Sequence, residues 1–388
     1  MARGSIQERV NKDGTTSYIA VIAFKDISTG KWRHIWKSAP SIRKAEALKT
    51  KLLTEVSKDN YTAPTKLTVE AYLKEWLSGL PGPVAPRTVQ LYEYITRIHI
   101  VPAFGSRPLT QLRPAQIQSL YSSLLKSGLA PRTVQICHVC IHKALKAAVK
   151  TGLLAANPAD NVTQVKPERH EIKTLQEKEV NVFLAAAKKT SYYPLFFTYL
   201  YTGFRRSELL CVRWCDVDLL GMTLSINRSM EYIHGVVTFK APKTKASRRL
   251  IALTPKNCIV LRELRDARDK TRQELDLPLT TDNDLVFCHE DDGTPMLPDT
   301  VTHAWIKLVR RNGYYGVRLH DARHTHASLL LKQGVHPKVV QERLGHSSIS
   351  TTLDTYSHTI PGMQKAAAVN FDTAMESEVP ESNSLDSR

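Results

Sequence analysis

The stretch HDARHTHASLLLKQGVHPKVVQERLGHSSISTTLDTYSHT, residues 320–359, decides the fold of the C-terminal half of this chain. Its apolar residues recur at helical spacing over 321–332 and again over 336–344, which predicts two successive helices. Gly334 and Gly345 stand where these helices should end, because glycine readily adopts the left-handed backbone of a helix C-terminus. The candidate functional residues of this stretch therefore lie on, or close to, two predicted helices that each end at a glycine.

Two pairs of side chains in this stretch can act on a phosphate group. Arg323 follows His320 by three residues, so both lie on one side of a helix. An arginine guanidinium binds phosphate through two parallel N–H groups and keeps its charge at any relevant pH. His346 follows the predicted helix stop, and Tyr356 lies ten residues later in a short predicted helix. A tyrosine phenol can attack phosphorus, so Tyr356 is the candidate nucleophile.

Two upstream segments add an arginine, an acid and a lysine. In TGFRRSELL (202–210), Arg205 begins a helix after a glycine turn, and Glu208 lies three residues further on. In APKTKASRRL (241–250), Lys243 lies in a turn between two predicted strands, at the tip of a hairpin. A lysine there can protonate an oxygen that leaves from DNA. Lys245 is the alternative for this role.

The order and spacing of these residues resemble the tyrosine recombinase (phage integrase) family. The resemblance covers every position of that family's active site: Arg205, Lys243, His320, Arg323, His346 and Tyr356. It implies that the tyrosine attacks DNA, leaving a 3′-phosphotyrosine and a free 5′-hydroxyl. It also implies that Glu208 orients an arginine rather than reacting. Neighbouring Arg206 and His324, and the rival Tyr314 and Tyr315, fit the pattern less well.

The resemblance also implies partners and an assembly. It predicts an integrase of a phage or integrative conjugative element, acting as a homotetramer on double-stranded DNA with core and arm attachment sites. An excisionase and a host DNA-bending protein are further expected partners. Two other functions stay open: a type IB topoisomerase, which acts on one duplex, and a non-catalytic DNA-binding regulator.

Composition agrees with a nucleic-acid partner. The 388 residues contain 54 Lys and Arg against 37 Asp and Glu, a net charge of +17, which favours a polyanion. No apolar run is long enough to span a membrane, and a cytoplasmic location is expected. Cys137 and Cys140 have metal-ligand spacing but fall in an apolar helical pattern, so no metal is predicted. No cofactor is predicted either, because no nucleotide-binding glycine motif occurs.

The predicted fold is multidomain α+β. A small domain with a three-stranded sheet and a helix (1–60) precedes an all-helical core-binding domain (67–165). A mainly α catalytic domain with a small antiparallel sheet (174–365) and an acidic, disordered tail (372–388) complete the chain. These core-binding and catalytic assignments rest on the resemblance.

The first 60 residues resemble the arm-type DNA-binding domain of integrases, most clearly at ThrGlyLysTrpArg (29–33). They carry 12 Lys and Arg against 6 Asp and Glu. The strands expected there are Ser5–Val10, Ser17–Phe24 and Trp32–Lys37, followed by a helix over Ile42–Lys58. A basic strand ribbon suits a DNA groove.

The segment AlaProArgThrValGln occurs twice, at 85–90 and 130–135, and predicts two helix starts suited to phosphate. The DNA-binding candidates from both regions are Arg33, Lys37, Arg87, Thr88, Arg132 and Thr133.

Overall fold

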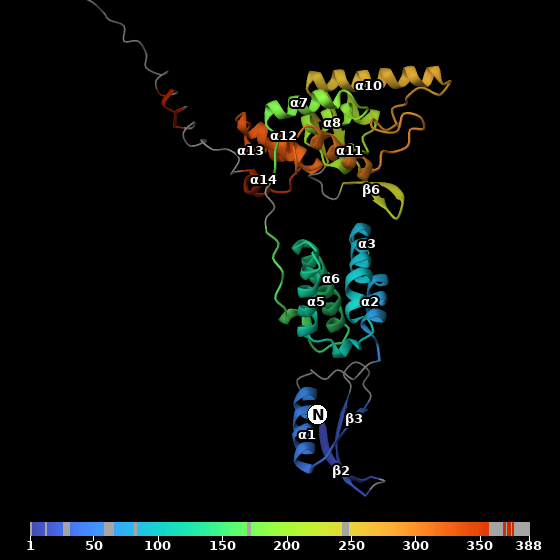
Figure 1. The fold of residues 1–388 in the computed structure, drawn as a ribbon, viewed down its shortest axis with the longest axis vertical. Coiled ribbons are helices and arrows are strands. Elements are labelled where there is room, and N and C mark those ends of the chain that lie inside the picture. Colours follow the sequence, from blue (N-terminus) through green and yellow to red (C-terminus); the bar gives the residue numbers. More distant parts are fainter. Residues whose placement is uncertain are drawn as a thin grey trace, which may run out of the picture. The chain divides into compact units, whose positions relative to one another are not determined.

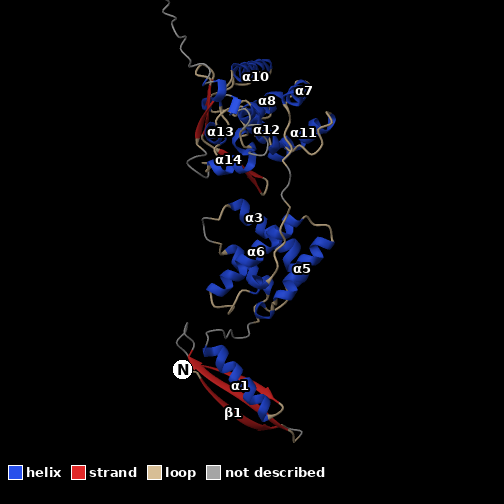
Figure 2. Cartoon of the chain, turned by 90° about the vertical axis from the view of Figure 1, so that its left-hand side faces the viewer, coloured by secondary structure: helices blue, strands red, loops and turns tan. Residues whose placement is uncertain are grey.

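The structure is a computed structural model that describes residues 2–11, 14–25, 32–57, 66–80, 84–168, 172–242 and 248–356, and residues 368, 369, 371–373 and 375. Two compact units divide the chain at Arg169 and His170. Figure 1 labels the helices and strands, and Figure 2 shows the helical and strand regions from the side. None of the helices in the described ranges is long and apolar enough to cross a membrane.

The N-terminal part is a three-stranded antiparallel sheet with one helix packed on it. The strands β1 (Arg3–Val10), β2 (Thr16–Lys25) and β3 (Trp32–Ala39) pair in the order β1-β2-β3, and α1 is Ile42–Ser57. Ile22 and Ile35 of the sheet are buried with Leu52 of α1. Because side chains alternate across a strand, this packing leaves the opposite face of the sheet open. The predicted three strands and helix are confirmed.

A bundle of helices follows in the same unit. Its elements are α2 (Val69–Ser78), α3 (Pro86–Ile95), the π-helix η1 (Thr96–Ile100), α4 (Val101–Phe104), η2 (Leu109–Gln111), α5 (Pro114–Lys126), α6 (Pro131–Lys150) and η3 (Pro158–Asn161). Within its apolar core, the Tyr72 hydroxyl of α2 donates to the Ala144 carbonyl of α6 at 2.6 Å, which links the two helices. Cys137 and Cys140 are buried in this core as free thiols. Burial raises the pKa of both, to about 12 and about 11.

The second unit is mainly helical. Its helices are α7 (Glu177–Ala187), α8 (Tyr193–Thr202), α9 (Arg206–Leu209), η4 (Trp214–Asp216), α10 (Pro255–Glu274), α11 (Pro298–Arg311), α12 (Leu319–Lys332), α13 (Pro337–Leu344) and α14 (Ile349–Tyr356). Trp305 of α11 lies at the centre of the core, with its ring 4.4 Å from that of Phe183 and 5.3 Å from that of Phe196. A smaller apolar cluster joins α12, α13 and α14. Gly345 ends α13 in left-handed backbone, as the sequence predicted.

The strands of this unit correct one prediction. They are β4 (Val217–Asp218), β5 (Thr223–Ile226), β6 (Ser229–Ile233), β7 (Val236–Lys240) and β8 (Arg249–Ala252). β8 pairs with β5 in the sheet β4-β5-β8, whereas β7 pairs with β6. The predicted hairpin between the strands that flank Lys243 is therefore wrong. The partner of β7 is β6, joined to it through His234 and Gly235, both with positive φ as two-residue hairpin turns require.

Few residues of the acidic tail are described. Residues 371–373 and 375 have helical backbone. The remaining tail residues lie outside the described part of the chain.

Candidate active site

Arg205 is oriented by the turn that precedes it and by the acid that follows. α8 ends at Gly203 in left-handed backbone, and Arg205 becomes the N-cap residue of the short helix α9. The carboxylate of Glu208 accepts from the Arg205 backbone N–H at 2.9 Å and from its Nη1 at 2.7 Å. Nη2 of Arg205 donates to the Gly345 carbonyl at 3.0 Å. Glu208 thus lies against Arg205, where the sequence placed it.

A second arginine binds the same carboxylate, and sequence reasoning missed it. Arg249 of β8 donates through Nη2 to Glu208 Oε2 at 3.0 Å and through Nε to the Arg343 carbonyl at 2.8 Å. Both partners are buried, with 7% and 3% of their side chains exposed. Burial alone would raise the pKa of Glu208, but Arg249 and Arg205 lower it below its ordinary value. The available signal was a charged residue at an inward strand position, two residues before buried Ile251.

Arg323 is held by two backbone carbonyls. It is almost fully buried on α12, and its Nη1 and Nη2 each donate at 2.7 Å, to Gly203 and Leu344 respectively. Arg205 and Arg323 therefore bind consecutive carbonyls, Leu344 and Gly345, at the C-terminus of α13, where a helix attracts cations. Burial and then the neighbouring Arg205 lower the pKa of Arg323 to about 10, so it stays charged at neutral pH.

Two histidines are the next candidates in this group of residues. His346 comes directly after the α13 stop, and its Nδ1 lies 2.9 Å from the Thr352 hydroxyl. Burial, then Arg323 and Arg205, lower the pKa of His346 to about 4. Loss of surrounding water and then Arg323 also lower the pKa of His320, although His320 as a whole residue is exposed. Both imidazoles are neutral at pH 7 and can donate an N–H to a phosphate oxygen.

Tyr356 ends α14 and points into the protein. It is 1% exposed and packs with the apolar cluster of α12 and α13. Its hydroxyl lies 2.7 Å from Nδ1 of His324, a residue that sequence reasoning set aside. Burial raises the pKa of the phenol above its ordinary value, and Arg323 opposes this. The phenol is therefore protonated before any reaction.

The structure thus brings five of the six candidates into one electrostatic group. Arg205, Arg323, His320, His346 and Tyr356 are linked by their mutual effects on pKa. Lys243 and its alternative Lys245 lie outside the described residues. No group of three or more His, Cys, Asp or Glu side chains in the described ranges is arranged to hold a metal ion.

The DNA-binding candidates of the N-terminal sheet, Arg33 and Lys37, are both exposed. Arg33 and Lys37 alternate in the same phase as Ile35, so they lie on the face that α1 covers. The open face carries Arg3, opposite Ala23, and Trp36, opposite Val21. A shallow hollow of about 320 Å³ lies over these residues.

The two repeated segments take the same local form. Arg87 and Arg132 are exposed in the first turns of α3 and α6, and each donates to a glutamine three residues later. The N–H groups of Thr88 and Thr133 donate to the carbonyls of Ala85 and Ala130. Neither helix has a side-chain cap.

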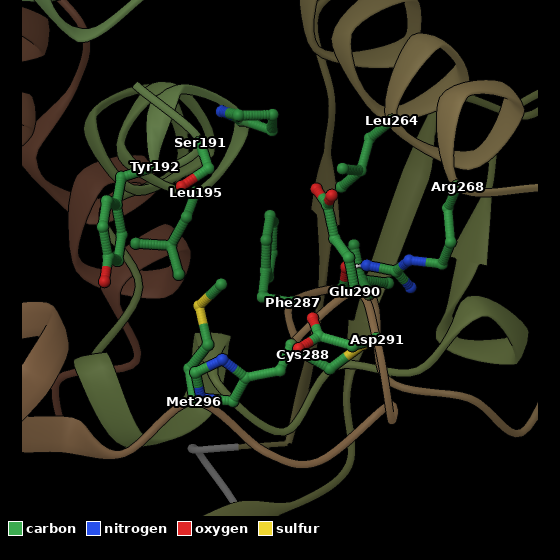
Figure 3. A pocket seen from close by; sticks show the side chains of 13 residues that line it. Ser191, Tyr192, Leu195, Leu264, Arg268, Phe287, Cys288, Glu290, Asp291 and Met296 are labelled. Atoms are coloured by element: carbon green, nitrogen blue, oxygen red, sulfur yellow. Dashed lines mark hydrogen bonds between the residues drawn. The ribbon is translucent and has the colours of Figure 1, made fainter. Parts of the chain in front are cut away.

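A separate cavity in the second unit holds none of the six candidates. It has a volume of about 190 Å³ and lies between α8, α10 and the segment 286–296 (Figure 3). Arg268 at its wall donates to the carbonyls of Leu285 and Val286. The cavity is a gap left where the segment 286–296 packs against α8 and α10.

Comparisons with known proteins identify the family. Residues 173–361 match the phage integrase family, and residues 68–125 match the phage integrase N-terminal SAM-like domain. A XerC-like tyrosine recombinase of Caldanaerobacter subterraneus is 30% identical over 306 residues, covering 73% of this chain and 77% of the relative. The chain belongs to the phage integrase family of tyrosine recombinases.

Further relatives of this recombinase include integrases of mobile elements. The ICEBs1 integrase of Bacillus subtilis is 26% identical over 336 residues, 86% of this chain and 90% of the relative. The fold is also that of the Tn1549 transposon integrase solved with a circular intermediate DNA. That structure has a TM-score of 0.67 and 20% identity, and the alignment covers 79% of this chain and 99% of the integrase. The chain is a site-specific tyrosine recombinase, which exchanges DNA strands.

Proposed function

We propose that this recombinase cuts DNA with Tyr356 while Arg205 and Arg323 hold the scissile phosphate. The phenol oxygen attacks phosphorus, the bond to the 5′ oxygen breaks, and a 3′-phosphotyrosine remains. A 5′-hydroxyl from the partner duplex then attacks this linkage and releases the tyrosine. Because the phosphodiester energy is kept in the covalent bond, the exchange needs no nucleotide.

The observation that carries this proposal is the excess of buried positive charge beside Tyr356. The guanidinium groups of Arg205, Arg249 and Arg323 lie close together. After burial, charge repulsion from Arg205 lowers the pKa of Arg249, and repulsion from both lowers the pKa of Arg323. One carboxylate, that of Glu208, lies among them. A partly buried cluster of this kind is favourable for an anion, and a phosphodiester fits the planar donor pattern of arginine. His320 and His346 add N–H donors, and Lys243 is the proposed proton donor to the leaving 5′ oxygen.

The test uses a nicked suicide substrate that carries the enzyme's own crossover site. Cleavage releases a short fragment, so the covalent adduct accumulates and is read on a denaturing gel. Tyr356→Phe should bind the substrate with unchanged affinity and form no adduct, because only the nucleophilic oxygen is lost. A full-strength adduct from this variant would show that another residue is the nucleophile.

We also propose the division of labour along the chain. Residues 67–165 and 174–365 bind the core site together, and residues 1–60 bind a separate arm site through the open face of the sheet, where Arg3 and Trp36 lie. Four subunits act together, since two duplexes contain four strands and each strand needs one tyrosine. The similarity to the ICEBs1 integrase supports integration and excision of a mobile element. We place this reaction in the cytoplasm and propose an excisionase and a host DNA-bending protein as partners.

Removal of residues 1–62 tests the arm role. The truncated protein should still cleave a core-site suicide substrate, because Tyr356 and its partners all lie beyond residue 200. It should recombine full attachment sites far less, since the bridge to the arm sites is lost. Equal integration by the truncated and intact proteins would refute the arm-binding role. The topoisomerase and regulator alternatives are not favoured by the matched relatives.

A further inference from the structure

His324 is the side chain that meets the hydroxyl of Tyr356. Its Nδ1 lies 2.7 Å from the phenol oxygen, and the two ring centroids are 5.6 Å apart. His320, one turn earlier on α12, packs edge-to-face against the His324 ring at 4.9 Å. Tyr356 is buried, so its hydroxyl is held against a nitrogen base inside its own subunit.

This contact supplies what the nucleophile needs. A phenol must lose its proton as its oxygen bonds to phosphorus, and a neutral imidazole has one ring nitrogen that can accept it. We propose that His324 holds the Tyr356 hydroxyl in position for attack and accepts its proton at Nδ1 as the bond to phosphorus forms. This inference rests on the proposed role of Tyr356 as the nucleophile.

The proton and the bonds balance over the step. The bond between the phenol oxygen and phosphorus forms while the bond to the 5′ oxygen breaks. The phenolic proton passes to His324, and the leaving 5′ oxygen takes a proton from the general acid proposed above. When a 5′-hydroxyl later attacks the phosphotyrosine, the proton of His324 returns to the phenol, and the enzyme regains its first state.

The surroundings decide when His324 can act as a base. The groups that act on it are His320, Asp321, Arg323 and Arg318 around α12, with Tyr356 on α14 and His346 before α14. Burial, then His320, lower the pKa of His324 to about 4, while Asp321 opposes them. The ring is therefore neutral at pH 7 but takes a proton reluctantly.

Bound DNA changes this balance. A phosphate anion between the arginines favours the charged form of a nearby imidazole and so raises its pKa. His324 then becomes a better proton acceptor only when the scissile phosphate is in place. The part-buried pair of Tyr356 and His324 is in this way inactive in the free protein and responsive to substrate.

Two substitutions separate positioning from proton transfer. His324→Asn places a carbonyl oxygen near the position of Nδ1, so it can accept a hydrogen bond but not a proton. His324→Leu can do neither. His303→Asn, at an exposed histidine of α11, is the matched control. The measurement is the single-turnover rate of adduct formation on the nicked substrate between pH 6 and pH 9, with DNA affinity and thermal melting measured in parallel.

We expect both His324 variants to bind DNA normally and to cleave roughly 100-fold to 1,000-fold more slowly at pH 7, as loss of a general base predicts. The rate of His324→Asn should rise about tenfold per pH unit, because solvent hydroxide must then remove the proton. The wild-type and His303→Asn rates should stay nearly level. A substrate with sulfur at the bridging 5′ position, whose leaving group needs no proton, should leave both variants slow.

Three results would overturn the inference. The first is a wild-type rate and a level pH profile for His324→Asn. The second is rescue by the sulfur leaving group, which would assign His324 to the departing oxygen. The third is an equally steep pH profile in His303→Asn. If His324→Leu fails to fold, His324→Asn decides the question. Failure of the proposed function is distinct, because it would appear as adduct formation by Tyr356→Phe.

Discussion

Replacing Glu208 by glutamine should separate the stability of the site from its chemistry. The carboxylate accepts from the backbone N–H and Nη1 of Arg205 and from both terminal nitrogens of Arg249. A glutamine side chain of the same shape has one acceptor oxygen and turns an NH₂ group toward donors. At least one of the two guanidinium groups therefore loses its hydrogen-bond acceptor, and both Arg205 and Arg249 lose the negative charge that faces them.

The magnitude follows from burial. Removing one partner of a buried ion pair costs about 3–5 kcal/mol. Arg205 is about one third exposed and regains water, whereas Arg249 is 7% exposed and cannot. We therefore expect a loss of about 3 kcal/mol, mostly from Arg249. For a unit of this size, a loss of about 3 kcal/mol in the free energy of unfolding corresponds to a fall of roughly 6–12 °C in melting temperature. Adduct formation should also fall, because Arg205 is no longer oriented.

The double variant Glu208→Gln with Arg249→Met is the control. An apolar residue in place of the second buried ion removes the unpaired charge, so stability should recover to within about 1 kcal/mol of wild type. Cleavage should not recover, since Arg205 still lacks its anchor. Differential scanning calorimetry and the suicide-substrate assay measure the two effects. A melting temperature within about 2 °C of wild type for Glu208→Gln, or full cleavage by the double variant, would refute this reasoning.

The ion pair also has a defined pH dependence. The folded-state pKa of Glu208 is lowered, so its contribution is complete above the unfolded value of about 4.3 and is lost as pH falls through the folded value. The difference in melting temperature between wild type and Glu208→Gln should accordingly shrink below about pH 4.

Three further outcomes are expected. Gly203→Ala should destabilise the second unit by about 1–3 kcal/mol in thermal melts, because the new methyl would lie 2.7 Å from the His326 ring and 2.8 Å from Leu344 at a φ of +67°. Gly128→Ala, also at positive φ but with nothing within 4 Å, should cost less, and an equal cost would contradict the packing argument. Arg323→Lys should bind DNA but lose roughly 100-fold or more in cleavage rate on the suicide substrate, since one ammonium cannot span two carbonyls and a phosphate. Strand cleavage should proceed in EDTA, and a requirement for restored Mg²⁺ would contradict the arginine-based mechanism.

Local sequence patterns were sufficient to predict most of the helices. Apolar spacing predicted α12 and α13, and Gly345 has the left-handed backbone expected of a helix stop. The N-terminal strands were readable because each is bounded by turn residues. The hairpin at Lys243 failed for a different reason: pairing joins distant segments, and a strand's partner cannot be read from its nearest neighbour in sequence. β6 is followed by His234-Gly235, a two-residue turn whose first residue is a weaker hairpin signal than asparagine or aspartate.

The missed site residues share one property. Arg249 and His324 matter through side-chain contacts that cross the fold, to Glu208 on α9 and to Tyr356 on α14. Their local sequence shows only a basic residue in a strand and a histidine next to Arg323. Periodicity can say which face of an element a residue takes, but not which group from another element meets it.

The two central arginines show why the fold and the proposed chemistry are coupled. A guanidinium has five N–H donors. Arg323 gives one each to the Gly203 and Leu344 carbonyls, and Arg205 gives one to Gly345. These bonds tie the end of α8 to the end of α13 and fix the planes of both guanidiniums before any phosphate arrives. Donors fixed in advance need no reorganisation during the reaction, which is the condition for strong stabilisation of a developing charge. His346 and α14 follow directly from the same α13 terminus, so the bonds that align the two arginines proposed to bind phosphate also position the segment that carries Tyr356.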